Sequence, residues 1–223
     1  MNETNRLYEV MITAFLVYLI LSYVYKRITV RNAEEALKRS DGLVLINLKN
    51  IMGILLFGVL FYVLLPDFRF LLWSFQIPST YILGLAVLVI MASGILAYRS
   101  ARNKLNDMDY VAYHSHYKVF LYAPIRILFL ISYEFFFRGV LFFSLLEIMS
   151  LWEAILITTV LYVVIHGFDS RNEIIGAIPF GMVLCLFSYV TQSVIIACLI
   201  HLSLSLIYEC YMFHRLTYKK QLS

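Results

Sequence analysis

Glu134, His166 and His201 are ionisable side chains that lie within long apolar stretches of this chain. Arg138 follows Glu134 four residues later, a spacing that places acid and base on the same face of a helix. A charged side chain at the centre of a bilayer costs about 2.5–3.5 kcal/mol on insertion scales, and such residues commonly mark a functional site. A carboxylate and two imidazoles that meet inside a helix bundle could perform general acid–base chemistry on a water molecule, or relay protons.

Each of these residues also has a purely structural interpretation. Glu134 and Arg138 could form an intrahelical ion pair, and His166 lies close enough to a helix end to be an interfacial histidine. His201 lies midway along an apolar block, where an imidazole needs a hydrogen-bond partner and must face the bundle interior. Glu173 is a second carboxylate within reach, although the first turn of a helix also suits it electrostatically. The sequence lacks a His-Glu-x-x-His zinc motif, so we expect no metal and no cofactor.

The composition is typical of an integral membrane protein. Of 223 residues, 62% are hydrophobic and 14% are charged, whereas about 25% of the residues in an average soluble domain are charged. The apolar residues form long blocks without strict alternation, which excludes an outer-membrane barrel and predicts a bundle of spanning helices. We therefore expect an all-α, polytopic transmembrane helix bundle of about seven spans, in a single integral-membrane domain over residues 1–223. The expected spans are Val10–Tyr25, Ile46–Leu65, Tyr81–Tyr98, Val119–Ile148, Leu151–Gly167, Ile174–Val190 and Val194–Phe213.

Basic residues concentrate in alternate connections between these blocks. The connections after the first, third and last blocks are rich in lysine and arginine, whereas the intervening ones are nearly free of them. The positive-inside rule then predicts an N-terminus outside and a C-terminus in the cytoplasm. Residues 26–42 carry mixed charge, with Glu34 and Glu35 spaced four before Lys38 and Arg39, and we expect them to form a cytoplasmic interfacial helix.

Several shorter features carry no catalytic signal. Residues 66–80 could form a short re-entrant piece, and residues 106–118, which contain His114 and His116, are expected to form a polar connector at the surface. The basic residues adjoin hydrophobic blocks and form no domain of their own, so we expect no nucleic-acid partner. The cysteines lie in apolar blocks, which argues against a disulfide framework.

Three short motifs occur in order on consecutive predicted spans: Tyr133-Glu134-x-x-x-Arg138-Gly139, Tyr162-x-x-x-His166 and His201-x-x-x-Ser205. The chain resembles the CPBP family of intramembrane endopeptidases, which comprises CAAX proteases and bacteriocin-processing (Abi) proteins. That family's motifs are Glu-Glu-x-x-x-Arg, Phe-x-x-x-His and His-x-x-x-Asn. The resemblance covers about residues 119–210, which would form a CPBP-like catalytic core.

The resemblance implies hydrolysis of a peptide bond by a water that Glu134 and His166 activate. Arg138 would hold the carboxylate in place, while His201 and Ser205 would stabilise the oxyanion. The implied partners are a peptide or lipidated-peptide substrate and the lipid bilayer, in a bacterial plasma membrane. The implied cavity opens toward the cytoplasm.

Three positions depart from the family pattern, and one of them, Tyr162 in place of phenylalanine, is harmless. Tyr133 stands where the family has its first glutamate, usually assigned as the general base, and Ser205 replaces an asparagine. Adjacent helical residues point about 100° apart, so Glu134 cannot occupy the place of the missing carboxylate. Either Glu134 or Glu173 takes the role of base, or the chain is a catalytically inactive relative that acts as a membrane binding or immunity protein. A proton-coupled transporter is a third interpretation, although no internal repeat supports it.

Overall fold

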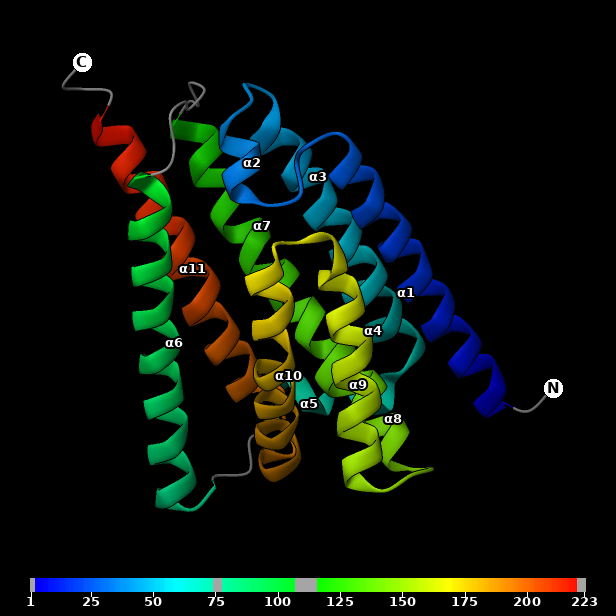
Figure 1. Cartoon of the computed structure of the whole chain (residues 1–223). Helices are drawn as coiled ribbons and strands as arrows, with labels where there is room; N and C mark the ends of the chain where they lie inside the picture. Colours follow the sequence, from blue (N-terminus) through cyan, green and yellow to red (C-terminus); the bar gives the residue numbers. More distant parts are fainter. Residues whose placement is uncertain (1–2, 74–77, 107–115, 220–223) are drawn as a thin grey trace.

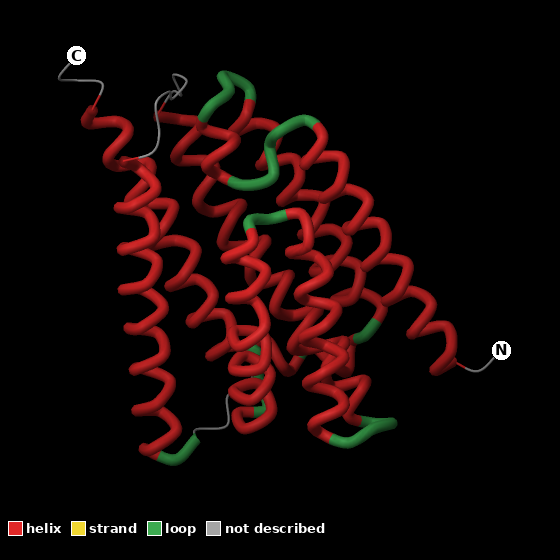
Figure 2. Tube along the Cα trace, viewed as in Figure 1, coloured by secondary structure: helices red, strands yellow, loops and turns green. Residues whose placement is uncertain are grey.

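The computed structural model describes residues 3–73, 78–106 and 116–219, which form helices joined by turns (Figures 1 and 2). Within these three ranges, seven helices are long and apolar enough to cross a membrane, which confirms the predicted all-α bundle. They are Arg6–Arg27, Gly42–Leu64, Thr80–Lys104, Tyr117–Leu146, Leu151–Phe168, Arg171–Thr191 and Ile195–His214.

One span forms the centre of the bundle. It runs through α7 (His116–Glu134), η3 (Phe135–Leu141) and α8 (Phe142–Leu146). In its most apolar stretch 72% of the residues are buried, against 22–39% in the other spans that the structure describes. This central helix carries Glu134 and Arg138, so the surrounding helices shield both charges from lipid.

Most of the other spans lie around this central helix, whereas α6 (Thr80–Asn106) packs on α11 (Ile195–Lys219) at one edge of the bundle (Figure 1). The remaining spans are α1 (Glu3–Arg27), the continuous run α3 (Gly42–Gly53), η1 (Ile54–Val59) and α4 (Leu60–Leu64), then α9 (Leu151–Ile165) and α10 (Arg171–Thr191). The two ends of the chain lie at opposite ends of the bundle, as an odd number of spans requires.

The central span and the span formed by α3, η1 and α4 each contain a wider, π-helical turn, and the two turns lie against each other. The ring of Phe57 in η1 stacks on that of Phe136 in η3, with centroids 4.5 Å apart and planes inclined by 18°. Gly58 permits the close approach, because a Cβ there would lie only 2.4 Å from the hydroxyl oxygen of Ser132. Single π-helical turns are frequent at functional sites, and η3 begins directly after Glu134.

The charged segment between the first two spans packs onto one end of the bundle. Its separate helix, α2, is limited to Ala33–Leu37, because α1 continues to Arg27 and α3 begins at Gly42. The helix in residues 26–42 is thus shorter than expected. Its apolar side is buried in a cluster that includes Tyr25 and Met212.

The charge pairs of this segment differ in part from those expected. Glu34 binds Lys38 at 3.3 Å, as its spacing predicted. Glu35, in contrast, pairs with Arg31. Arg39 turns instead to Asp41, at 2.9 Å. Arg31 precedes α2, and its backbone N–H also donates to Glu35 at 2.8 Å, so this arginine satisfies both oxygens of the carboxylate.

This pairing makes stability depend on pH. Burial disfavours the Glu35 carboxylate, but hydrogen bonds from the side chain and backbone of Arg31 outweigh burial and lower the pKa of Glu35 below its ordinary value of 4.5. A carboxyl group with a lowered folded-state pKa stabilises the fold above its unfolded pKa, and this contribution is lost as pH falls through the folded pKa. We expect the melting temperature in detergent to decline below about pH 4.5, and less steeply for Glu35→Gln. An equally steep decline in both proteins would contradict this pairing.

At the opposite end of the bundle, two short helical segments follow the second span; that this part of the chain re-enters the membrane stays a prediction. The two segments are a 3₁₀ turn, η2 (Pro66–Phe68), and α5 (Phe70–Trp73). The buried Leu71 accepts hydrogen bonds at its carbonyl oxygen from the Val194 N–H and the Ser193 hydroxyl, each at 3.0 Å. These bonds fix the turn from which α11 begins. Residues 107–115, most of the expected polar connector, lie outside the described residues, so the His114 and His116 pair is not placed.

Candidate active site

The carboxylate of Glu134 is fully buried at the centre of the bundle and contacts two motif residues. Its Oε1 lies 2.5 Å from Nδ1 of His201 on α11. Its Oε2 lies 3.2 Å from Nη1 of Arg138, one helical turn away. The structure thus brings together the first and third motifs, which are 67 residues apart in the sequence.

Arg138 is as deeply buried as Glu134. Its guanidinium carbon lies 4.2 Å from the ring centroid of Tyr162, so the aromatic face of the second motif balances part of the cationic charge. Nε and Nη2 of Arg138 have no hydrogen-bond partner among the residues that the structure describes. Arg138 therefore holds the Glu134 carboxylate with one nitrogen and keeps further donors unused inside the bundle.

His201 is positioned by the turn that precedes α11. Gln192 ends α10 in a left-handed conformation, with φ of 48°, and the Ser193 hydroxyl then accepts from the Ile195 N–H at 3.2 Å. The imidazole is 7% exposed and meets the ring of Phe180 edge-on at 5.5 Å. Because a carboxylate only accepts hydrogen bonds, we assign Nδ1 of His201 as the donor to Glu134.

His166 lies at the end of α9, in the short turn η4 (His166–Phe168). Its Nδ1 lies 2.8 Å from Oδ2 of Asp169, whereas its Nε2 is buried and has no partner in the described part of the chain. Within that part, no hydrogen bond or ion pair joins His166 to Glu134 or His201. The structure therefore does not bring the two imidazoles into direct contact.

Tyr162 lies between these groups. Its ring centroid is 4.7 Å from that of His166 and 5.9 Å from that of Tyr133. The Tyr133 ring in turn lies 6.0 Å from the His201 ring. The hydroxyl of Tyr133 is buried without a partner among the described residues. All three motifs thus meet around two tyrosine rings.

Ser205 and Glu173 lie apart from this cluster. Ser205 is half-buried on α11, one turn beyond His201. Glu173 is exposed, and its carboxylate accepts from the Ser170 N–H at 3.2 Å while its own N–H donates to the Ser170 hydroxyl at 3.4 Å. Glu173 thus forms a reciprocal capping box with Ser170 at the start of α10, which agrees with its structural interpretation. A catalytic role for either residue stays a prediction.

Two residue pairs escaped the sequence analysis. Asp169 follows His166 by three residues, so the i,i+3 spacing could have revealed the contact between them. Arg126 on α7 and Glu209 on α11 form an interhelical ion pair at 3.1 Å. Because Arg126 and Glu209 are 83 residues apart, no spacing pattern in the sequence could have indicated this pair.

The cluster provides acid–base groups. Each imidazole has a carboxylate partner, Glu134 for His201 and Asp169 for His166. A carboxylate fixes the tautomer and orientation of an imidazole, an arrangement that hydrolases use to move protons to and from a reacting water. Among the described residues, no three His, Cys, Asp or Glu side chains lie together in a way that could hold a metal ion.

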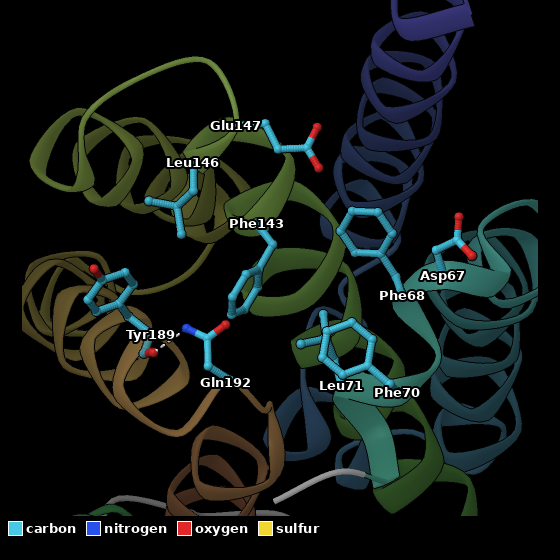
Figure 3. A pocket seen from close by; sticks show the side chains of 9 residues that line it. All are labelled: Asp67, Phe68, Phe70, Leu71, Phe143, Leu146, Glu147, Tyr189 and Gln192. Carbon is cyan, nitrogen blue, oxygen red and sulfur yellow. Dashed lines mark hydrogen bonds between the residues drawn. The ribbon is translucent and has the colours of Figure 1, made fainter. Parts of the chain in front are cut away.

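A pocket of about 400 Å³ lies near the α5 end of the bundle, apart from this cluster (Figure 3). Phe68, Phe70, Phe143 and Tyr189 line it, with Asp67 and Glu147 among its polar residues. Leu71, another lining residue, packs toward Gly139, where a Cβ would lie 3.5 Å from its side chain. No motif residue lines this pocket, so we do not assign it to the polar cluster.

Residues 115–207 match a family model described as type II CAAX prenyl endopeptidase, Rce1-like. The chain carries an Rce1-like segment. The match confirms the CPBP and CAAX protease resemblance drawn from the three motifs, all of which lie inside it. No curated protein and no solved structure matches the chain. The matched residues include Glu134, Arg138, His166 and His201, so the Rce1-like segment contains the whole buried cluster.

Proposed function

We propose that this integral membrane protein is an intramembrane endopeptidase that hydrolyses a peptide bond of a membrane-associated, lipidated peptide. The observation that carries the proposal is the contact of 2.5 Å between Glu134 and His201 inside the Rce1-like segment. Glu134 and His201 form a buried acid–imidazole pair between two helices. Ionisable side chains at this depth cost more free energy than apolar side chains would, which favours a functional role for the pair. The description of the matched family supplies the substrate class, a prenylated C-terminal peptide.

The residues divide the work of hydrolysis in a physically consistent way. His166, with one ring nitrogen free, accepts a proton from the attacking water. Glu134 holds the Nδ1–H of His201 and stabilises the imidazolium form of the ring, in which Nε2–H donates to the oxygen of the substrate carbonyl, with the Ser205 hydroxyl as a second donor. Arg138 balances the charge of the Glu134 carboxylate. This assignment departs from the expectation that Glu134 acts with His166, because the recorded contact of Glu134 is with His201.

We also propose that the end of the bundle that carries α2 faces the cytoplasm of a bacterial cell. Lys26, Arg27, Lys38 and Arg39 all lie at this end, and the chain's C-terminal end lies there too (Figure 1). This placement follows the positive-inside rule and puts the N-terminus outside.

One specific feature favours a second candidate, a catalytically inactive relative that binds a membrane partner. Tyr133 occupies the place of the family's first glutamate, and the Glu134 carboxylate is already engaged by Arg138 and His201. A protein of this kind would keep the cluster for stability alone.

Purified protein in liposomes separates the two candidates. We expect the wild-type chain to cleave a fluorogenic farnesylated C-terminal peptide faster than the same peptide without the lipid, and His201→Ala to lose this activity. Retention of the folded, monodisperse state by His201→Ala, measured by size-exclusion chromatography, is the control. If His201→Ala lowers only the melting temperature, and no peptide is cleaved by the wild type, the binding protein is the correct interpretation.

A further inference from the structure

Asp169 is a carboxylate that belongs to no motif, yet it contacts a motif histidine. Its Oδ2 lies 2.8 Å from Nδ1 of His166, and both side chains are about one-quarter exposed, at 23% and 25%. Because the carboxylate can only accept, its presence selects the tautomer of His166 with the proton on Nδ1. Nε2 is then the nitrogen with a free lone pair, and it is the atom that is buried without a partner in the described residues.

The free nitrogen belongs to a ring at the edge of the buried cluster. The His166 ring packs against Tyr162 at 4.7 Å, and Tyr162 also lies 4.2 Å from the guanidinium carbon of Arg138. A proton acceptor on this side of Tyr162 complements the Glu134–His201 pair on the Tyr133 side. The two acid–imidazole pairs thus border the same tyrosine rings from different helices.

The turn that carries His166 and Asp169 is held from several sides. Nη1 of Arg31 donates to the Phe168 carbonyl oxygen at 3.0 Å, and Lys26 lies 5.3 Å from the centroid of the Phe168 ring. The capping box of Ser170 and Glu173 fixes the start of α10 immediately after the turn. An orientation held in this way is what a proton acceptor needs, because a small misplacement of the imidazole is costly in rate.

Charged and titratable groups from several elements lie beside this turn. They are Lys26 and Tyr23 on α1, Arg31 before α2, Tyr162 on α9 and Glu173 on α10.

We propose that Asp169 is a positioning residue that makes His166 the general base of the peptidase; this rests on the proposed function. Nε2 of His166 takes a proton from water as the water oxygen bonds to the peptide carbonyl carbon. The carbon–nitrogen bond then breaks, and the proton on Nε2 passes to the leaving amine. Asp169 stays bonded to Nδ1 throughout and takes no proton.

Two substitutions of Asp169 distinguish a role in setting the tautomer from a purely structural role. In the first case Asp169→Asn should lose more activity than Asp169→Ala, and in the second case it should not. Asp169→Asn keeps size and polarity, but its amide donates to Nδ1 and forces the proton onto Nε2, where the lone pair was needed. We expect it to lower kcat about 10³–10⁴-fold, as loss of the correct tautomer does in serine hydrolases. Asp169→Ala leaves either tautomer available and should lower kcat only about 10–10²-fold. KM should change little in both, because neither variant alters peptide binding.

The assay uses the full chain in liposomes with the farnesylated fluorogenic peptide. Asp41→Asn is the matched control, since Asp41 is exposed and pairs with Arg39 at the bundle end, and it should cleave like the wild type. Asp169→Glu should recover part of the activity lost in Asp169→Ala. If Asp169→Ala is impaired as much as or more than Asp169→Asn, the role is structural and the inference fails. If the wild type itself cleaves nothing, the proposed function fails instead.

Discussion

Replacing Glu134 with glutamine is expected to lower peptide cleavage about 10²–10⁴-fold, the range associated with loss of a positioned acid–base group. Glutamine has nearly the same shape but no charge, so it can orient His201 only weakly. Glu134 is fully buried, and its contact with Nδ1 of His201 is 2.5 Å, so the substitution removes the charge directly at this imidazole. Initial rates on the farnesylated peptide, at matched protein concentration in liposomes, measure the effect.

The control for this change is another carboxylate on the same span. Glu147 is exposed at the end of α8 and contacts none of the three motifs, so Glu147→Gln should cleave normally. Because residues that act as a unit give non-additive losses, the double variant Glu134→Gln/His201→Ala should be no slower than the worse single variant. If folded Glu134→Gln cleaved the peptide at the wild-type rate, Glu134 would have no role in the reaction.

Removing the partner of this carboxylate is expected to cost stability. Arg138→Met leaves the buried Glu134 charge without its cation, and breaking one side of a buried ion pair costs about 3–5 kcal/mol. The loss should appear as a large fall in the denaturation midpoint of the detergent-solubilised protein. Adding Glu134→Gln to Arg138→Met should recover part of the loss, because the orphaned charge is then gone.

An exposed pair supplies the comparison for this experiment. Arg39 binds Asp41 at 2.9 Å with side chains 41% and 54% exposed, and such surface pairs contribute about 0–1 kcal/mol. Arg39→Met should therefore leave the midpoint nearly unchanged. If Arg138→Met lowered the denaturation midpoint no more than Arg39→Met does, Glu134 and Arg138 would not form a buried, charged pair.

The spans and the inward-facing position of His201 could be predicted from the sequence because each rests on a strong physical constraint. Backbone groups in lipid must be satisfied within helices, so apolar blocks of sufficient length gave the seven spans. A mid-span histidine must face the interior, and His201 indeed meets Glu134 there. The family match then confirmed the resemblance carried by the three motifs.

Other features depend on details that residue spacing does not encode. The wider turns of η1 and η3 arise where Phe57 and Phe136 stack, a tertiary contact invisible in either segment alone. By spacing alone, Glu35 could pair with Arg39 as well as with Arg31. In the structure, Arg31 binds Glu35 through both its side chain and its backbone N–H. Spacing on a single helix also says nothing of which imidazole a carboxylate meets, so only coordinates could favour His201 over His166 as the partner of Glu134.

Hydrolysis in water labelled with oxygen-18 shows whether this chain cleaves a peptide bond with water. The wild-type chain is incubated in liposomes with a farnesylated C-terminal peptide, and the products are analysed by mass spectrometry. We expect cleavage with one labelled oxygen in the new carboxyl group of the lipidated fragment, and at least about 10²-fold less of this product from Glu134→Gln in the same time. Equal labelled product from the wild type and from Glu134→Gln, or none from the wild type, would contradict this expectation.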